Sequence, residues 1–144
     1  MLDTVQLNPP TIIYEIEEAT KAIGFTMGSD HLTGSLLRVL VTSKPSGSIL
    51  ELGTGAGLAT AWLLDGMNAQ SSLVTVERNE DNIAIAKKFL GQDSRVTFHG
   101  EDGSSFIQSV FKEGRTFDLI FADMPPGKYQ YLEEILIILT TKIS

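Results

Sequence analysis

Three glycines at alternate positions, Gly53, Gly55 and Gly57, constrain the fold of this chain more than any other feature. They follow a short apolar run at 49–52, typical of a strand buried in a parallel sheet, and precede a helical pattern at 58–67. Without Cβ atoms the backbone can turn sharply and a ligand can approach it closely. The stretch therefore predicts a strand, a glycine-rich turn and a helix. The turn either binds a ligand or has a purely structural role.

The residues around the turn indicate which ligand it suits. A dinucleotide-binding turn needs a small residue at the place held by Leu58, so a nicotinamide-dependent oxidoreductase is disfavoured. Glu51 stands two residues before Gly53, where its charge repels a pyrophosphate but suits an ammonium or sulfonium group. The turn therefore favours a cationic ligand.

Composition excludes several classes of protein. The 144 residues carry a net charge of −7 and include no cysteine, which excludes disulfides, thiolate zinc sites and cysteine nucleophiles. No stripe of Lys and Arg is present to neutralise nucleic-acid phosphates. Residues 1–10 lack the features of a signal peptide, and the longest apolar run, 135–139, is too short to cross a bilayer. We expect a soluble, cytoplasmic protein without nucleic-acid or membrane partners.

The rest of the chain alternates between strand-like and helix-like segments. We predict strands at 49–52, 72–76, 95–98 and 117–122, and helices at 11–23, 31–43, 58–67, 79–90, 104–113 and 131–141. The expected fold is α/β, a Rossmann-like, doubly wound, mainly parallel sheet in the order 3-2-1-4 with two N-terminal helices. Residues 1–144 are expected to form one domain, with 1–45 as a helical cap and 46–144 as a cofactor-binding core.

Two finer expectations concern the N-terminal helices. Thr11 is expected to cap the first of them. The second should pack on the sheet through its apolar residues, which are Leu32, Leu36, Leu37, Val39 and Leu40.

Acidic residues follow the second and third predicted strands. Glu77 ends the strand at 72–76, where a carboxylate can accept hydrogen bonds from the two hydroxyls of a ribose; the alternative is a surface acid. After the strand at 95–98, Asp102 can accept the exocyclic amine of adenine, while Gly103 and Ser104 offer backbone N–H groups to its ring. The alternative there is a helix N-cap formed by Asp102 or Ser104.

By these residues the chain resembles the class I S-adenosylmethionine-dependent methyltransferases, and among them the O-methyltransferase-like, catechol-type group. The motifs are LELGTGAG at 50–57, TVE at 75–77, FDLIFAD at 117–123, and the N-terminal stretches FTMGSD at 25–30 and TGSLLR at 33–38. The resemblance implies S-adenosylmethionine as cofactor and methyl transfer to an oxygen of a small-molecule acceptor.

The resemblance also implies roles for single residues of the donor site. Glu51 and the turn around Gly53, Thr54, Gly55 and Gly57 would hold the methionine ammonium. Glu77 would bind the ribose diol and residues 102–104 the adenine, while Met27 and Ser29 would close the pocket from the N-terminal side.

On the acceptor side, the resemblance implies that Asp123 is a carboxylate ligand for Mg²⁺, which would bind both oxygens of a catechol-like acceptor. Catechol-type members place a basic lysine three residues after this aspartate. Here Pro126 holds that place and Lys128 comes two residues later, so the assignment of Lys128 as the base departs from the family pattern. The loop at 123–129 forms either a shaped entrance for the acceptor or a rigid connection without substrate contact.

A second departure is that family members continue into further strands, which usually supply another Asp and Asn to the metal. Four strands in the order 3-2-1-4 leave the fourth as an open edge, so the sequence is either truncated or another element covers that strand. The alternative function is a non-catalytic cofactor-binding module that forms a homodimer through this edge.

Overall fold

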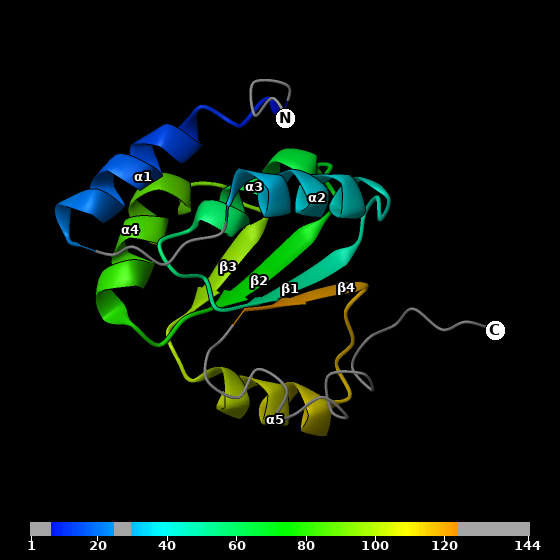
Figure 1. The fold of residues 1–144 in the computed structure, drawn as a ribbon. Helices are drawn as coiled ribbons and strands as arrows, with labels where there is room; N and C mark the ends of the chain where they lie inside the picture. Colours follow the sequence, from blue (N-terminus) through cyan, green and yellow to red (C-terminus); the bar gives the residue numbers. More distant parts are fainter. Residues whose placement is uncertain (1–6, 25–29, 124–144) are drawn as a thin grey trace.

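A computed structural model describes residues 7–24 and 30–123, and Figure 1 shows its fold. The helices are α1 (Ile12–Ala22), α2 (His31–Thr42), α3 (Leu58–Gly66), α4 (Glu80–Leu90) and α5 (Gly103–Glu113). The strands are β1 (Ser48–Leu52), β2 (Ser72–Val76), β3 (Val96–His99) and β4 (Leu119–Ala122). The predicted helix at 131–141 lies outside the described residues. None of the helices in the described ranges has the length and apolarity needed to cross a membrane.

The four strands form one parallel sheet in the order β3-β2-β1-β4, which confirms the predicted Rossmann-like α/β fold. The register sets Glu51 of β1 beside Thr75 of β2 on one side and Phe121 of β4 on the other. Because all strands run the same way, their carboxyl ends meet at one edge of the sheet. The residues that follow β1, β2 and β4 therefore lie close together.

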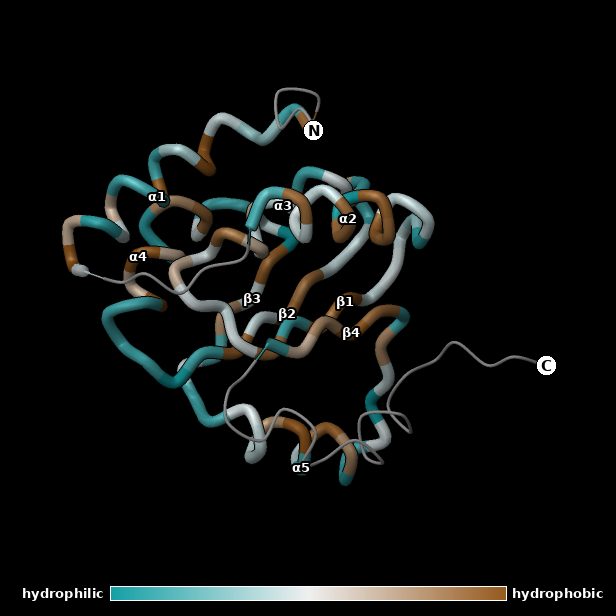
Figure 2. The backbone as a smooth tube through the Cα atoms, in the orientation of Figure 1, coloured by the Kyte–Doolittle hydropathy of each residue, from teal (hydrophilic) through white to brown (hydrophobic). Residues whose placement is uncertain are grey.

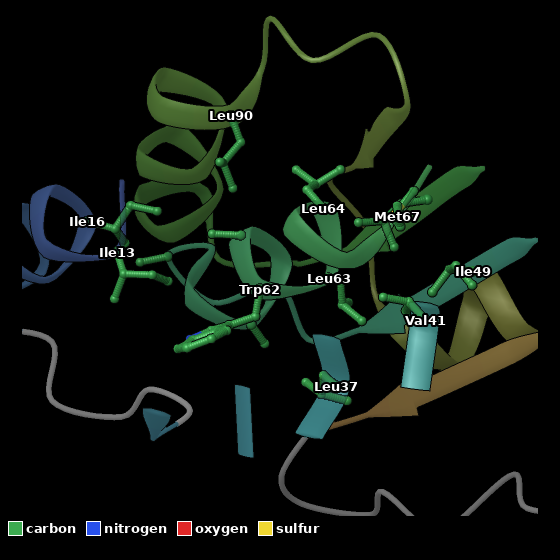
Figure 3. Packing of buried hydrophobic residues seen from close by; sticks show 14 residues of the cluster. Ile13, Ile16, Leu37, Val41, Ile49, Trp62, Leu63, Leu64, Met67 and Leu90 are labelled. Atoms are coloured by element: carbon green, nitrogen blue, oxygen red, sulfur yellow. The ribbon is translucent and has the colours of Figure 1, made fainter. Parts of the chain in front are cut away.

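Helices cover both faces of the sheet, with α5 on one face and α1 to α4 on the other (Figure 1). Figure 2 shows hydrophobic residues concentrated along the strands. Successive residues of a strand point to opposite faces, so Ile49 joins the core beneath α2 and α3 while Leu50 joins the core against α5. Trp62 of α3 is fully buried in the first of these cores, where Leu37 and Val41 of α2 also lie (Figure 3).

The predicted packing face of α2 is wrong. Of the five apolar residues expected to face the sheet only Leu37 is buried, and Leu36 and Val39 are 57% and 64% exposed. The buried face is instead formed by Gly34, Leu37 and Val41. Gly34 explains the difference, because the absence of its Cβ lets α2 approach the Trp62 ring, and this contact turns the other apolar residues outward.

The capping prediction for α1 is also wrong. Thr11 has helical backbone angles and its side chain makes no capping hydrogen bond. Side-chain caps occur at α2, where Asp30 accepts a hydrogen bond from the Thr33 N–H at 2.7 Å, and at α4, where Asn79 accepts one from the Asn82 N–H at 3.0 Å.

Candidate functional site

The glycine-rich turn joins β1 to α3 and is attached to the end of β2. Gly53, Gly55 and Gly57 have φ angles of 101°, 54° and 101°, all in the left-handed region that favours glycine. The N–H groups of Gly53 and Thr54 both donate to the Val76 carbonyl oxygen, at 2.8 and 3.1 Å. The turn is therefore fixed against the neighbouring strand.

Gly57 has a packing role that its sequence context does not reveal. A Cβ at this position would lie 3.1 Å from the Cβ of Ala86 and 3.1 Å from a methyl carbon of Leu90, both on α4. The structure thus requires glycine here for the contact between the turn and α4. The roles of Gly53 and Gly55 lie in the backbone conformation of the turn itself.

Glu51 is fully buried, one residue before the end of β1, on the face of the sheet that α3 covers. Its Oε1 accepts hydrogen bonds from the hydroxyls of Thr60, at 2.5 Å, and Thr75, at 2.8 Å. The Thr75 hydroxyl also lies 2.5 Å from that of Thr54 in the turn. Within the described part of the chain, the other carboxyl oxygen, Oε2, is buried without a hydrogen-bond partner. Glu51 therefore presents one satisfied and one unsatisfied oxygen.

The surroundings of Glu51 favour its neutral form. Burial raises the pKa of Glu51 to about 7, and the negative charges of Asp123 and Glu77 act in the same direction, while the hydrogen bonds from Thr60 and Thr75 oppose the shift. A positively charged group at Oε2 would both satisfy that oxygen and favour its ionised form.

Glu77 follows β2 and is partly exposed. Its Oε1 accepts a hydrogen bond from the Gly55 N–H at 2.8 Å, and its Oε2 accepts one from the Asn79 N–H at 2.9 Å. Each carboxylate oxygen has two lone pairs, so both oxygens can accept a further hydrogen bond. Glu77 thus links the end of β2 to the glycine-rich turn and keeps capacity for a ligand hydroxyl.

Asp102, Gly103 and Ser104 lie at the start of α5, after β3. Asp102 occupies the N-cap position with extended backbone angles, yet its side chain makes no capping hydrogen bond and is exposed. Asp102 therefore holds the N-cap position of the alternative interpretation, without the side-chain hydrogen bond of a cap. Gly103 is buried and Ser104 is partly buried.

Asp123 directly follows β4, and its N–H donates to the Leu52 carbonyl oxygen at 2.8 Å. Its backbone therefore lies beside the end of β1, and its side chain is exposed. Across residues 7–24 and 30–123 no group of three His, Cys, Asp or Glu side chains could hold a metal ion. Met27, Ser29 and Lys128, also predicted from the sequence, lie outside the described residues.

Sequence reasoning missed the hydroxyls of Thr60 and Thr75. They lie 9 and 24 residues after Glu51, on α3 and β2. The one available signal was a threonine within the otherwise apolar end of β2, at the register position beside Glu51.

The sequence and the structure of this chain were each compared with known proteins, and both comparisons identify methyltransferases. The sequence profile of a family described as "Methyltransferase domain" matches residues 50–141. A catechol O-methyltransferase of Niastella koreensis is 32% identical over 99 residues, which cover 65% of this chain and 45% of that protein.

Two solved structures have the same fold. An O-methyltransferase from Bacillus cereus in complex with SAH has a TM-score of 0.80 and 25% identity, with 90% of this chain and 62% of the other covered. An SAH-bound methyltransferase from Podospora anserina has a TM-score of 0.72 and 26% identity, with 91% and 59% covered. The chain spans between 42% and 53% of the length of the curated relatives it matches. The matched profile covers more than half of the chain, which therefore belongs to the methyltransferase-domain family.

Proposed function

We propose that this protein binds S-adenosylmethionine and transfers its methyl group to an oxygen of a small-molecule acceptor. The observation that carries the proposal is the fully buried Oε2 of Glu51, which has no hydrogen-bond partner among the described residues and is close in sequence to the glycine-rich turn. A buried carboxyl oxygen without a partner costs about 1–3 kcal/mol, and the α-ammonium of the donor would satisfy it. The names of the relatives, which are O-methyltransferases, support the reaction class.

The residues that follow the strands fit the parts of the donor. Glu51 would accept from the ammonium, and Glu77 would accept from the ribose hydroxyls while it keeps its bonds to Gly55 and Asn79. Asp102, free of a capping bond, would accept from the adenine amine, with Gly103 and Ser104 beside it.

The proposed reaction is an in-line nucleophilic displacement at the methyl carbon of the donor. The acceptor oxygen forms a bond to the methyl carbon, the carbon–sulfur bond breaks, and its electron pair stays on sulfur as a neutral thioether. Since the sulfonium is already activated, the chain has to position both partners and exclude water. Met27 and Ser29 would close the donor pocket from the N-terminal side.

Asp123 is proposed to face the acceptor, with Lys128 as the base that removes its proton. Mg²⁺ is commonly held by one or two protein carboxylates together with waters and substrate, and Asp123 can supply one of them. When bound, the ion would favour the ionised form of a catechol-like acceptor. A cytoplasmic location is part of the proposal, and the absence of cysteine is consistent with it.

The alternative function is a cofactor-binding module without catalysis that forms a homodimer. It is favoured by the sheet order, which leaves β4 paired only with β1 among the described strands. An open strand edge presents unpaired N–H and C=O groups to a second chain.

Calorimetric titration with S-adenosylmethionine and with its demethylated product tests the donor site. We expect saturable binding in the micromolar range, and no heat of binding at millimolar ligand would refute the proposal. Turnover on a panel of phenols and catechols, with and without Mg²⁺, then tests the reaction. Donor binding without turnover, together with a dimer in sedimentation, would instead support the alternative.

A further inference from the structure

Glu51 and its hydroxyl partners form a chain of hydrogen bonds that leaves a single carboxyl oxygen free. Both hydroxyls that reach the carboxyl, from Thr60 and Thr75, donate to the same oxygen, Oε1. Because the Thr75 hydroxyl donates its only proton to Glu51, its oxygen is the acceptor in the contact with the Thr54 hydroxyl. The Thr60 and Thr75 protons point to Oε1 and the Thr54 proton points to the Thr75 oxygen, so the network fixes the carboxyl group and, among the described residues, leaves Oε2 without a partner.

The charged groups around Glu51 are acids. Complete burial is the main cause of the raised pKa of Glu51, and the charges of Asp123, which follows β4, and Glu77, which follows β2, raise it further. The charged residue of α3, Asp65, pairs with Arg38 at 2.9 Å near the other end of that helix. In the described ranges the recorded hydrogen-bond partners of Glu51 are the two threonine hydroxyls, with no ion pair. Within the described part of the chain, an ionised Glu51 would thus have no positively charged partner before a ligand binds.

We propose that Thr60 and Thr75 are positioning residues for the donor, and that donor binding expels a proton from the Glu51 carboxyl. The inference rests on the proposed function. Below pH 7 the Glu51 carboxyl is mainly neutral in the empty protein. When the donor's α-ammonium reaches Oε2, the carboxyl ionises and its proton passes to solvent, which leaves a carboxylate paired with an ammonium. The threonine hydroxyls stabilise this ionised state because they can only donate to it.

The inference predicts proton release with a defined pH dependence. With a pKa of about 7 in the empty protein and an ionised carboxyl in the complex, binding at pH 6 releases about 0.9 of a proton, and binding at pH 8 releases about 0.1. Affinity therefore increases about tenfold from pH 6 to pH 8. A network with a purely structural role predicts neither effect.

The experiment is calorimetric titration of the full chain with the demethylated donor, which carries the ammonium but no sulfonium. At each pH the titration is repeated in buffers with different enthalpies of ionisation, and the slope of the observed heat against that enthalpy gives the number of protons released. Glu51→Gln should bind without proton release and with the same affinity at pH 6 and pH 8.

Thr60→Val and Thr75→Val preserve side-chain shape and remove one hydroxyl donor each. Each loss disfavours the carboxylate, so the midpoint of proton release should move to higher pH and binding should weaken at least threefold. Thr20→Val is the matched control, since it removes a buried threonine hydroxyl that donates to the Ile16 carbonyl oxygen within α1. It should leave proton release and affinity unchanged.

The outcomes separate this inference from the proposed function. Binding by the wild type with less than about 0.2 of a proton released at pH 6, and with equal affinity at pH 8, overturns the inference and leaves the donor site intact. Proton release that persists in Glu51→Gln also overturns it, because another group would then be the source. No binding by the wild type overturns both.

Discussion

Replacing Gly34 with alanine should destabilise this protein, although the same change inside a helix normally stabilises it by about 1 kcal/mol. Gly34 is the fourth residue of α2, and a Cβ at its position would lie 2.2 Å from Cδ1 of the Trp62 indole. Real Cβ atoms essentially never approach another heavy atom within 3.0 Å, so the helix and the ring would have to separate by about 0.8 Å, the difference between these distances.

The Trp62 ring has little freedom to move away. It is fully buried, the Arg38 guanidinium lies 4.6 Å from the ring centroid, and the His31 ring lies 6.0 Å away. Overpacking of a rigid core costs about 1–3 kcal/mol and occasionally more, and this clash with a rigid ring belongs at the upper end. The gain of about 1 kcal/mol in helix propensity offsets part of this cost. The net loss in the free energy of unfolding is therefore about 2 kcal/mol, which corresponds to a decrease of about 6 °C in Tm for a chain of this size.

Urea unfolding followed by circular dichroism measures this loss. Val39→Ala is the control on the same helix, because Val39 is 64% exposed and its truncation should change the free energy of unfolding by less than about 0.5 kcal/mol. In a Trp62→Leu background the cost of Gly34→Ala should shrink, since the smaller side chain gives the new methyl group room. A Gly34→Ala protein as stable as the wild type, or more stable, would refute the account of the packing of α2.

Three further predictions concern the site. The pKa of Glu51 is raised from its ordinary value of 4.5 to about 7, so its contribution to stability is fully present below pH 4.5 and is lost as the pH rises through 7. Relative to Glu51→Gln, the wild type should lose about 3 kcal/mol of unfolding free energy between these pH values, as measured by urea titrations. Parallel curves of unfolding free energy against pH for the two proteins would contradict the raised pKa. Gly57→Ala combines a φ of 101° with contacts of 3.1 Å to α4, and it should lower the unfolding free energy by about 1–3 kcal/mol, whereas an unchanged urea midpoint would argue against this turn geometry. Chelation of metal ions with EDTA should reduce turnover of a catechol acceptor at least tenfold without weakening donor binding, and Asp123→Asn should have the same two effects. Full activity in EDTA would refute the proposed role of the metal.

The layout of the sheet was predictable because it depends on local patterns. β1, β2 and β4 are short, mainly apolar segments, and the alternate glycines from Gly53 to Gly57 favour a sharp turn from a strand into a helix. The parallel order then places Glu51, Glu77 and Asp123 at one edge without any knowledge of side-chain contacts.

The features that could not be predicted from the sequence depend on contacts between residues far apart in the chain. The orientation of α2 follows from Gly34 meeting Trp62, 28 residues later, and no periodicity in α2 itself contains that information. The partners of Glu51 were hidden for the same reason, since a threonine that donates to a buried carboxyl looks in sequence like any other threonine of a strand or helix. The packing role of Gly57 requires knowledge of where Ala86 on α4 lies.

Under the proposed function, the contacts at this edge would divide the site into a fixed donor side and a separate acceptor side. Glu51 and Glu77 both bond to other parts of the turn region: Glu51 reaches Thr54 through the Thr75 hydroxyl, and Glu77 accepts directly from the Gly55 N–H. A change in either acid therefore alters the turn as well as the ligand contact. Asp123 joins this edge through one backbone bond to Leu52 and has an exposed side chain, and its charge is a smaller cause of the raised pKa of Glu51 than burial is. Substitutions at Asp123 should thus change acceptor turnover far more than donor affinity.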